Sequence, residues 1–345
     1  MSGYPFAARS DGRQSAVNSV CDAERHRQWR TLVMIPSESI CHPQSAAPLA
    51  GELGNIYAEG LPQPLLSHDA RQAAYDVPRF ASWRTRLSDK RFYKGTENAD
   101  RVELIAHDGI ARAFGRLEGS PEPDEIYVNV QALSGAAANL SVYEALLKPG
   151  DRIMGLELGH GGHLTHGSPF NLSGRTYEVH SYGIDEATRR LDYERIRAMA
   201  REVRPRMIVG GASAYPWDFD WAALRDIADE VGALLLADVA HLAGLVVGGA
   251  AANPLPHADV VTFTTHKTIC GPRGAVILTT DPAIARRIDM AVFPGLQGGP
   301  HMNTIAGIAR HFELILEDYE GFRELQRATV ENTRRFGELL SEQGF

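Results

Sequence analysis

The sequence predicts an α/β protein in which a mostly parallel, seven-stranded sheet is sandwiched by helices. From residue 125 onward, short apolar segments alternate with amphipathic ones, a pattern typical of crossover connections between parallel strands. Two of the apolar segments run into a charged side chain, Asp238 and Lys267, although burying a charge is costly unless it is paired or neutralised. We therefore expect a functional site where these strands end.

The expected elements follow one another along the chain. A helix is predicted for residues 21–33 and an amphipathic helix for residues 98–117, where apolar side chains recur near one face. Strands are predicted for residues 126–129, 152–155, 176–181, 207–210, 233–237, 260–263 and 275–279. Helices between them are predicted for residues 136–147, 193–203, 221–231 and 283–290, and one long helical segment for residues 302–340.

The composition is that of an ordinary globular protein. Of 345 residues, 44% are hydrophobic and 23% charged, so the chain can bury a large core. A net charge of -8 argues against nucleic acid as the main partner. The cysteines Cys21, Cys41 and Cys270 form no disulfide or zinc pattern, and no apolar run suits a signal peptide or a membrane span. These features predict a cytoplasmic protein that does not enter the membrane.

The segment Thr262–Gly274 carries the main chemical signal. An apolar strand runs into hydroxyl groups, His266 and Lys267. Such a Lys is either a surface side chain in a polar turn or an imine-forming nucleophile. A second apolar strand, which ends on Asp238, favours the nucleophile. Pyridoxal phosphate requires this pair, because the Lys holds its aldehyde as an imine and the Asp keeps its pyridine nitrogen protonated.

Other motifs suit the same cofactor, although each alone has a simpler explanation. Ser134-Gly135-Ala136 starts a helix, where free N–H groups attract anions, but it could be a plain turn. In the histidine-rich loop 160–167, His163 could stack on a cofactor ring. The histidine spacing also suggests a metal, but the loop itself contains no carboxylate or cysteine, so we expect none. Ser213 and His241 could donate to the phenolic oxygen of the cofactor.

Taken together, these stretches resemble the serine hydroxymethyltransferase family of fold-type I pyridoxal phosphate enzymes. The resemblance covers about residues 30–345. The matching stretches are residues 57–60, 160–169, 185, 211–215, 238–246, 253–254, 264–274 and 293–300. The fold that the resemblance implies is the large domain of that fold type.

The resemblance implies a role for each matching residue. The implied cofactor-binding residues within one subunit are Ser134, Gly135, Ala136, His163, Ser213, Asp238, His241, His266 and Lys267. The implied catalytic residues are Lys267, Asp238, His241, Thr264 and Glu59. Tyr57, Glu59 and Gly299 would reach the cofactor from the second subunit of a homodimer, and Glu59 would handle the proton of the substrate hydroxyl. Ser37, Tyr57, Glu59 and Tyr93 would lie near the amino-acid substrate.

The sequence departs from the family pattern in four places. The hydroxyl residue that usually follows Ser-Gly in the phosphate loop is Ala136, a loss of roughly 1 to 2 kcal/mol if nothing replaces it. Residues 61–91 form an insertion, after which Phe92 stands where the family has Tyr. Ile56 replaces a Lys. A small C-terminal domain, which would supply an Arg for the substrate carboxylate, is not expected within the chain.

The resemblance implies an N-terminal arm with a helix (residues 1–54), a cofactor-binding large domain (55–300) and a helical segment (301–345) that leads to the small domain. The implied reaction interconverts serine and glycine with tetrahydrofolate, as part of one-carbon and amino-acid metabolism. The insertion favours a competing activity, a threonine transaldolase or aldolase that passes the glycyl unit to another aldehyde. Glu59, Leu158, Leu164 and Phe293 favour folate. A third hypothesis is a catalytically poor homologue that acts as a binding partner.

Overall fold

The computed structural model describes residues 15–62, 71–84 and 90–345. Contacts divide the chain into two compact units, residues 1–38 and 39–345. The described part of the first unit contains helix α1 (Ala16–Arg30), which buries no side chain. Pairs one turn apart, such as Arg27 with Glu24, lie along its surface. The helix predicted for residues 21–33 is therefore present, but it begins five residues earlier.

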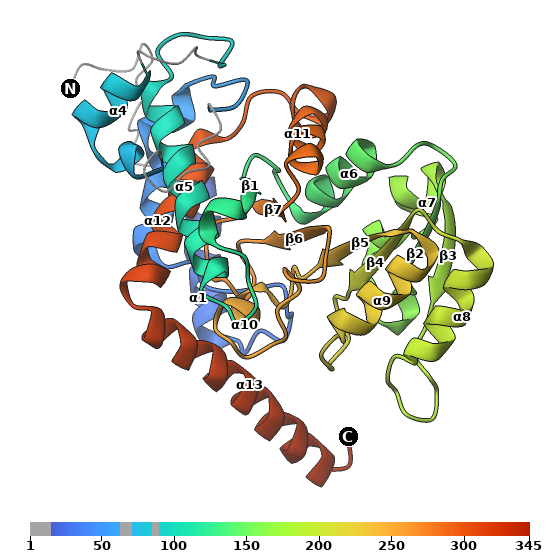
Figure 1. Cartoon of the computed structure of the whole chain (residues 1–345). Coiled ribbons are helices and arrows are strands. Elements are labelled where there is room, and N and C mark those ends of the chain that lie inside the picture. Colours follow the sequence, from blue (N-terminus) through green and yellow to red (C-terminus); the bar gives the residue numbers. More distant parts are fainter. Residues whose placement is uncertain (1–14, 63–70, 85–89) are drawn as a thin grey trace. The chain divides into compact units, whose positions relative to one another are not determined.

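The second unit is built on one seven-stranded sheet with the order β1-β7-β6-β5-β4-β2-β3 (Figure 1). The strands are β1 (Tyr127–Asn129), β2 (Arg152–Leu156), β3 (Glu178–Tyr182), β4 (Met207–Gly211), β5 (Leu234–Asp238), β6 (Val260–Thr264) and β7 (Ala275–Thr279). Only β7 runs antiparallel to its neighbours, β1 and β6, whereas the pairs among β2 to β6 are parallel. The predicted mostly parallel α/β sheet is confirmed.

Helices cover both faces of this sheet. Helices α6 (Gly135–Leu146) and α11 (Pro282–Met290) pack on one face, and α5 (Glu97–Gly115), α8 (Tyr193–Val203) and α9 (Trp221–Val231) lie on the other with α12 (Met302–Glu317). Strand β6 shows why two cores form. Val260 packs in the core beneath α6 and α11, while Val261 and Phe263 pack in the core on the opposite face of the sheet. Alternation along fully buried strands therefore fills both layers.

Two expectations about element boundaries were wrong. Strand β3 begins at Glu178, because Thr176 still belongs to the short helix α7 (Leu172–Thr176). The long helical segment at residues 302–340 is two helices, α12 and α13 (Tyr319–Glu342). Asp318 separates them with a non-helical backbone (φ -131°), and its side chain accepts from the amide of Gly321 to cap α13.

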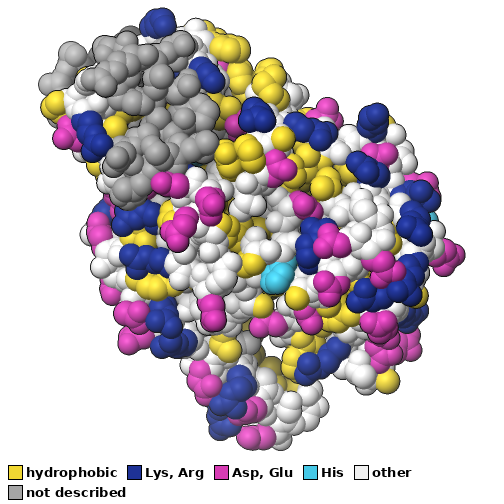
Figure 2. Space-filling model, viewed as in Figure 1, with side chains coloured by type: hydrophobic (Ala, Val, Ile, Leu, Met, Phe, Trp, Pro, Cys, Tyr) yellow, Lys and Arg dark blue, Asp and Glu magenta, His cyan; other side chains and the backbone are white. Residues whose placement is uncertain are grey.

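Shorter elements complete the second unit. They are α2 (Pro43–Ala46), η1 (Ala47–Ala50), η2 (Glu52–Asn55), η3 (Ala73–Tyr75), α4 (Val77–Arg84), η4 (Pro123–Glu125), η5 (Leu158–His160), η6 (Leu164–His166), α10 (Ala243–Val247) and η7 (Ala291–Leu296). Helix α4 lies in the predicted insertion, of which residues 63–70 and 85–89 fall outside the described residues. Among the described helices, none has the length and apolar character to cross a bilayer. On the face in Figure 2, acidic and basic side chains are mixed rather than separated into patches.

Candidate active site

The carboxyl ends of parallel strands β4, β5 and β6 meet at a cavity of about 200 Å³, here called the strand-end cavity. Asp238 is the last residue of β5 and Thr264 the last of β6, while Ser213 and Lys267 follow β4 and β6 by a few residues. The lining residues are Ser134, Gly135, Ala136, His163, Ala212, Ser213, Asp238, Ala240, His241, Thr264, His266, Lys267 and Arg273. The structure thus brings together the cofactor residues that were predicted within one subunit. Ala212, Ala240 and Arg273 had not been assigned a role.

Asp238 lies at the end of a buried strand with several hydrogen-bond donors around its carboxylate. Its Oδ2 accepts from Nδ2 of Asn139 at 2.7 Å and from Nε2 of His166 at 3.0 Å, and its Oδ1 accepts from the amide of Ala240 at 3.0 Å. Burial alone would raise the pKa of Asp238, but the bonds from His166 and Asn139 outweigh it and hold the pKa well below its usual range. The carboxylate is therefore charged at neutral pH.

His166 has a defined tautomer in this arrangement. Its Nδ1 accepts from the backbone amide of His163 at 3.3 Å, so its proton lies on Nε2, which donates to Asp238. The sequence had assigned no role to His166 or to Asn139. Helix α6 and loop 160–167 lie far from residue 238 in the sequence. No local motif therefore predicts that Asn139 and His166 contact Asp238.

One sequence argument against a metal site was wrong. It stated that no carboxylate accompanies the histidines of loop 160–167, but the fold brings Asp238 to them, and ligand atoms of His163, His166 and Asp238 lie within 4.8 Å of one another. Hydrogen bonding already explains this group, because Asp238 accepts from His166 and Asn139. The absence of a metal stays a prediction.

Lys267 lies in the turn after β6, with its side chain facing the cavity. Burial lowers the pKa of Lys267, although the charge of Asp238 opposes this shift. The turn is rigid: the amide of Cys270 donates to the Lys267 carbonyl at 2.8 Å, and the amide of Gly271 donates to that of Thr265 at 2.7 Å. Thr264 donates to the Ala240 carbonyl at 3.2 Å, which ties this turn to the loop after β5. A lowered pKa leaves more of the Lys267 amine uncharged and nucleophilic.

The other side of the cavity suits an anion. Helix α6 begins at Gly135, where a side-chain Cβ would come within 2.9 Å of Thr264 Cγ2, so only glycine fits there. Ser134 caps the helix by accepting from the amide of Ala137 at 3.3 Å. Nδ1 of His266 is buried, and it has no hydrogen-bond partner among the described residues. Burial, Arg273 and Lys267 lower the pKa of His266 to about 4.

A second group of predicted residues, here called the loop cluster, consists of Tyr57, Glu59, Tyr93 and Gly299. The Tyr93 hydroxyl donates to Oε2 of Glu59 at 2.9 Å, and the Tyr57 and Tyr93 rings meet edge to face at 6.5 Å. A Cβ at Gly299 would come within 3.0 Å of the Tyr57 ring. None of these four residues lines the strand-end cavity of the same chain. Ser37 belongs to the first unit, so its prediction as a substrate residue stays a prediction.

Arg91 explains how the loop cluster tolerates the insertion. Its buried guanidinium donates to the carbonyls of Ala58 and Gly60, each at 2.7 Å, and pairs with Asp100 and Glu103. The amide of Phe92 donates to the Glu59 carbonyl at 3.0 Å. The two ends of the inserted segment are therefore joined at its base, and the backbone around Glu59 is fixed from both sides.

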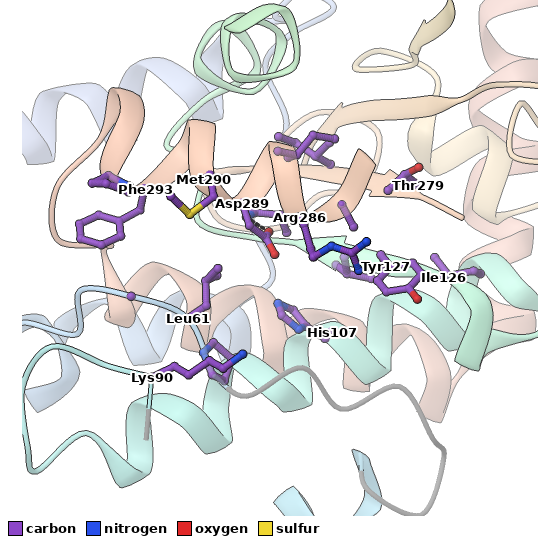
Figure 3. A pocket seen from close by; sticks show the side chains of 18 of the residues that line it. Leu61, Lys90, His107, Ile126, Tyr127, Thr279, Arg286, Asp289, Met290 and Phe293 are labelled. Carbon is purple, nitrogen blue, oxygen red and sulfur yellow. Dashed lines mark hydrogen bonds between the residues drawn. The ribbon is translucent and has the colours of Figure 1, made fainter. Parts of the chain in front are cut away.

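A larger cavity of about 540 Å³ lies elsewhere, between the base of the insertion, β1 and α11 (Figure 3). Its walls are mostly apolar, and Asp289 faces it from α11 while His107 faces it from α5. Burial raises the pKa of Asp289 to about 6 despite a hydrogen bond from Asn129. This larger cavity is separate from the strand-end cavity, because neither Lys267 nor Asp238 lines it.

Comparison with known proteins agrees with this geometry. A family model described as serine hydroxymethyltransferase matches residues 84–345. The chain is 44% identical over 321 residues to a serine hydroxymethyltransferase from Synechococcus sp. (strain JA-3-3Ab), covering 93% of this chain and 65% of the relative. It is 42% identical over 340 residues to one from Nostoc sp. (strain PCC 7120), covering 98% of this chain and 70% of the relative. The chain thus spans about two thirds of the length of these relatives, and it belongs to the serine hydroxymethyltransferase family.

Proposed function

We propose that the protein is a pyridoxal phosphate enzyme that breaks and forms the Cα–Cβ bond of β-hydroxy amino acids, interconverting serine and glycine with tetrahydrofolate. The observation that carries the proposal is the strand-end cavity, in which an amine with a lowered pKa and a charged carboxylate face the same space. The relatives bear the name of this activity. Because the chain spans only about two thirds of their length, the reaction of the whole protein is inferred from its site.

The cavity residues fit pyridoxal phosphate. The buried Nδ1 of His266 and the start of α6 at Gly135 suit a phosphate. At the other end, Asp238 would pair with the pyridine nitrogen. His163 would cover the ring, and Ser213 with His241 would contact its hydroxyl oxygen. The backbone amides near Ala136 would compensate for the hydroxyl that this position lacks.

The side chains divide the chemical work. When bound, the cofactor supplies an electron sink for the pair released at the substrate Cα. Lys267 would hold the cofactor through its aldehyde, because a lowered pKa leaves more of the amine uncharged and nucleophilic. Asp238 stays ionised because His166 and Asn139 donate to it, so it provides a fixed counter-charge. Thr264 lies at the end of β6 and, by donating to the Ala240 carbonyl, would order the turn that carries Lys267.

The loop cluster supplies the remaining base in this proposal, from the second subunit of a homodimer. Glu59 is bound by Tyr93 and lies outside the cavity of its own chain. From a partner subunit it would accept the proton of the substrate hydroxyl as the Cα–Cβ bond breaks. Tyr57 and Gly299 would approach the cofactor phosphate with it, and Ser37 and Tyr93 would contact the substrate.

A rate comparison tests the proposed function. The full chain, loaded with pyridoxal phosphate, is supplied with serine and tetrahydrofolate in one assay and with threonine and a trial aldehyde in another. We expect glycine to form from serine and its rate to depend on tetrahydrofolate. Glycine formed only from threonine with an aldehyde acceptor would contradict hydroxymethyl transfer. No glycine from either assay would contradict the proposed reaction.

A further inference from the structure

Thr262 lies behind the candidate active site rather than in it. It is a buried residue of β6, 1% exposed, and it is not among the residues that line the strand-end cavity. Its hydroxyl donates to Oδ1 of Asn139 on α6 at 2.7 Å. Asn139 is also 1% exposed, and its Nδ2 donates to Asp238 at 2.7 Å. A three-residue chain of hydrogen bonds therefore runs from the interior of the sheet to the carboxylate.

The side-chain amide of Asn139 is hydrogen-bonded through its nitrogen and through its oxygen. Its Nδ2 donates to Asp238 and to Oγ1 of Thr165, which lies 2.8 Å away, and its only oxygen accepts from Thr262. If the amide turned over, Oδ1 would face the charged oxygen of Asp238, which is repulsive. If the Thr262 hydroxyl were removed, Oδ1 would be buried without a donor, which is costly. Thr262 thus favours the one orientation in which Asn139 stabilises the carboxylate.

We propose that Thr262 is a positioning residue for the cofactor: through Asn139, it fixes the carboxylate of Asp238 that pairs with the pyridine nitrogen. This inference rests on the proposed function, because it assigns Thr262 a part in binding pyridoxal phosphate. A simpler explanation is that the hydroxyl only satisfies a buried amide, in which case it supports the fold and not the site. The two explanations differ in whether cofactor affinity changes more than stability does.

The experiment measures the Kd of pyridoxal phosphate and the Tm of the apoprotein for Thr262→Val, which keeps the shape of the side chain but removes the donor. We expect a Kd about tenfold weaker than that of the wild type. Thr262→Ser keeps the hydroxyl and should restore the Kd to within about twofold. Thr279→Val is the matched control, because Thr279 is a buried threonine of β7 that donates to the Asp259 carbonyl, outside the cavity. It should lower Tm and leave the Kd unchanged.

A double-mutant comparison tests the route through Asn139. The double variant Thr262→Val, Asn139→Ala should have a Kd within about twofold of that of Asn139→Ala alone. Without the Asn139 amide, the Thr262 hydroxyl has nothing to orient. An unchanged Kd in Thr262→Val, or a full further loss in the Asn139→Ala background, would overturn the inference while the proposed function stands. A folded wild-type protein that binds no pyridoxal phosphate would overturn the proposed function, and this inference with it.

Discussion

The strand-end cavity and the loop cluster each hold a carboxylate, but in opposite settings. In the cavity, Asp238 is 6% exposed, and both of its oxygens accept hydrogen bonds within the chain. In the loop cluster, Tyr57 is 68% exposed. Within the part of the chain that the structure describes, the carboxylate of Glu59 accepts one hydrogen bond, from Tyr93, which is 47% exposed. The first region is therefore organised by its own fold, whereas the second presents its side chains outward.

The difference follows from the cost of burial. A charged group that is removed from water must be bonded from several sides, so a buried site forms only together with the network around it. A partly exposed carboxylate such as Glu59 keeps water as a partner, so it does not need a complete network within its own chain. In this comparison, the cavity should determine cofactor binding, and the loop cluster should determine turnover after dimerisation. The predictions below test that division, from the largest expected effect to the smallest.

The largest effect is expected for Lys267→Ala. Activity should fall by at least about a thousandfold, because the nucleophile that holds the cofactor aldehyde is removed. Borohydride reduction of the wild type should attach a pyridoxyl group to Lys267, detectable by peptide mass, and the variant should show none. Lys148→Ala, which changes an exposed lysine away from the cavity, should keep both properties. Full activity in Lys267→Ala would remove the basis of the assignment.

Asp238→Asn should weaken pyridoxal phosphate binding by about a hundredfold, because the protonated pyridine would lose its counter-charge. Equilibrium titration of the apoprotein measures this. Asp259→Asn is a control for removing a carboxylate, since Asp259 pairs with Arg225 at 2.8 Å outside the cavity. It should leave cofactor affinity unchanged, although it should cost stability. Equal affinities in Asp238→Asn and the wild type would refute the pairing.

Glu59→Gln should separate the two regions. We expect turnover to fall by about 10- to 100-fold while cofactor affinity stays at the wild-type value, because the base is lost and the cavity is untouched. Glu59→Gln and Lys267→Ala subunits are then mixed in equal amounts, unfolded together and refolded. This sample should recover about a quarter of wild-type activity, because half of the dimers would contain one subunit of each variant and carry one intact site of two. No recovery in demonstrably mixed dimers would argue against shared sites.

The smallest effect concerns pH. Burial and Lys267 lower the pKa of His241 to about 4, and burial and Arg273 do the same for His266. In the unfolded chain both would titrate near 6.5, so between pH 6.5 and about 4 the unfolded state binds more protons and stability falls as the pH falls. Tm should drop by about 5 °C from pH 7 to pH 4.5.

Variants test how much of this acid sensitivity comes from the strand-end cavity. A double replacement of His241 and His266 by Gln should reduce the dependence of Tm on pH but not abolish it, because burial also lowers the pKa of His311 to about 4 and that of His107 to about 3. Glu59→Gln changes only the loop cluster and should keep the wild-type slope. If the double replacement left the slope unchanged, the two cavity histidines would not be the source of the acid sensitivity.

Much of the fold could be predicted because it depends on local patterns. The helices at Tyr193–Val203 and Trp221–Val231 and the strand at Ala275–Thr279 lie where the periodicity placed them. The break at Asp318 was missed because apolar residues recur on both sides of it, and only the cap on α13 ends the first helix. The strand-end residues Asp238 and Lys267 were found because a charge at the end of an apolar run is unusual in any fold.

The partners of those charges could not be predicted in this way. Asn139, His166 and Thr262 are ordinary residues in a helix, a loop and a strand. The bonds that connect them to Asp238, directly or through Asn139, span 72 to 123 residues of sequence. The metal argument failed for the same reason, since the carboxylate near His163 comes from β5. Sequence by itself determined the fold class, the family and the positions of Asp238 and Lys267, because these depend on local pattern and on the order of motifs along the chain. Only the tertiary structure decided which side chains stabilise them, because buried polar groups take their partners from whichever segments the packing brings within bonding distance.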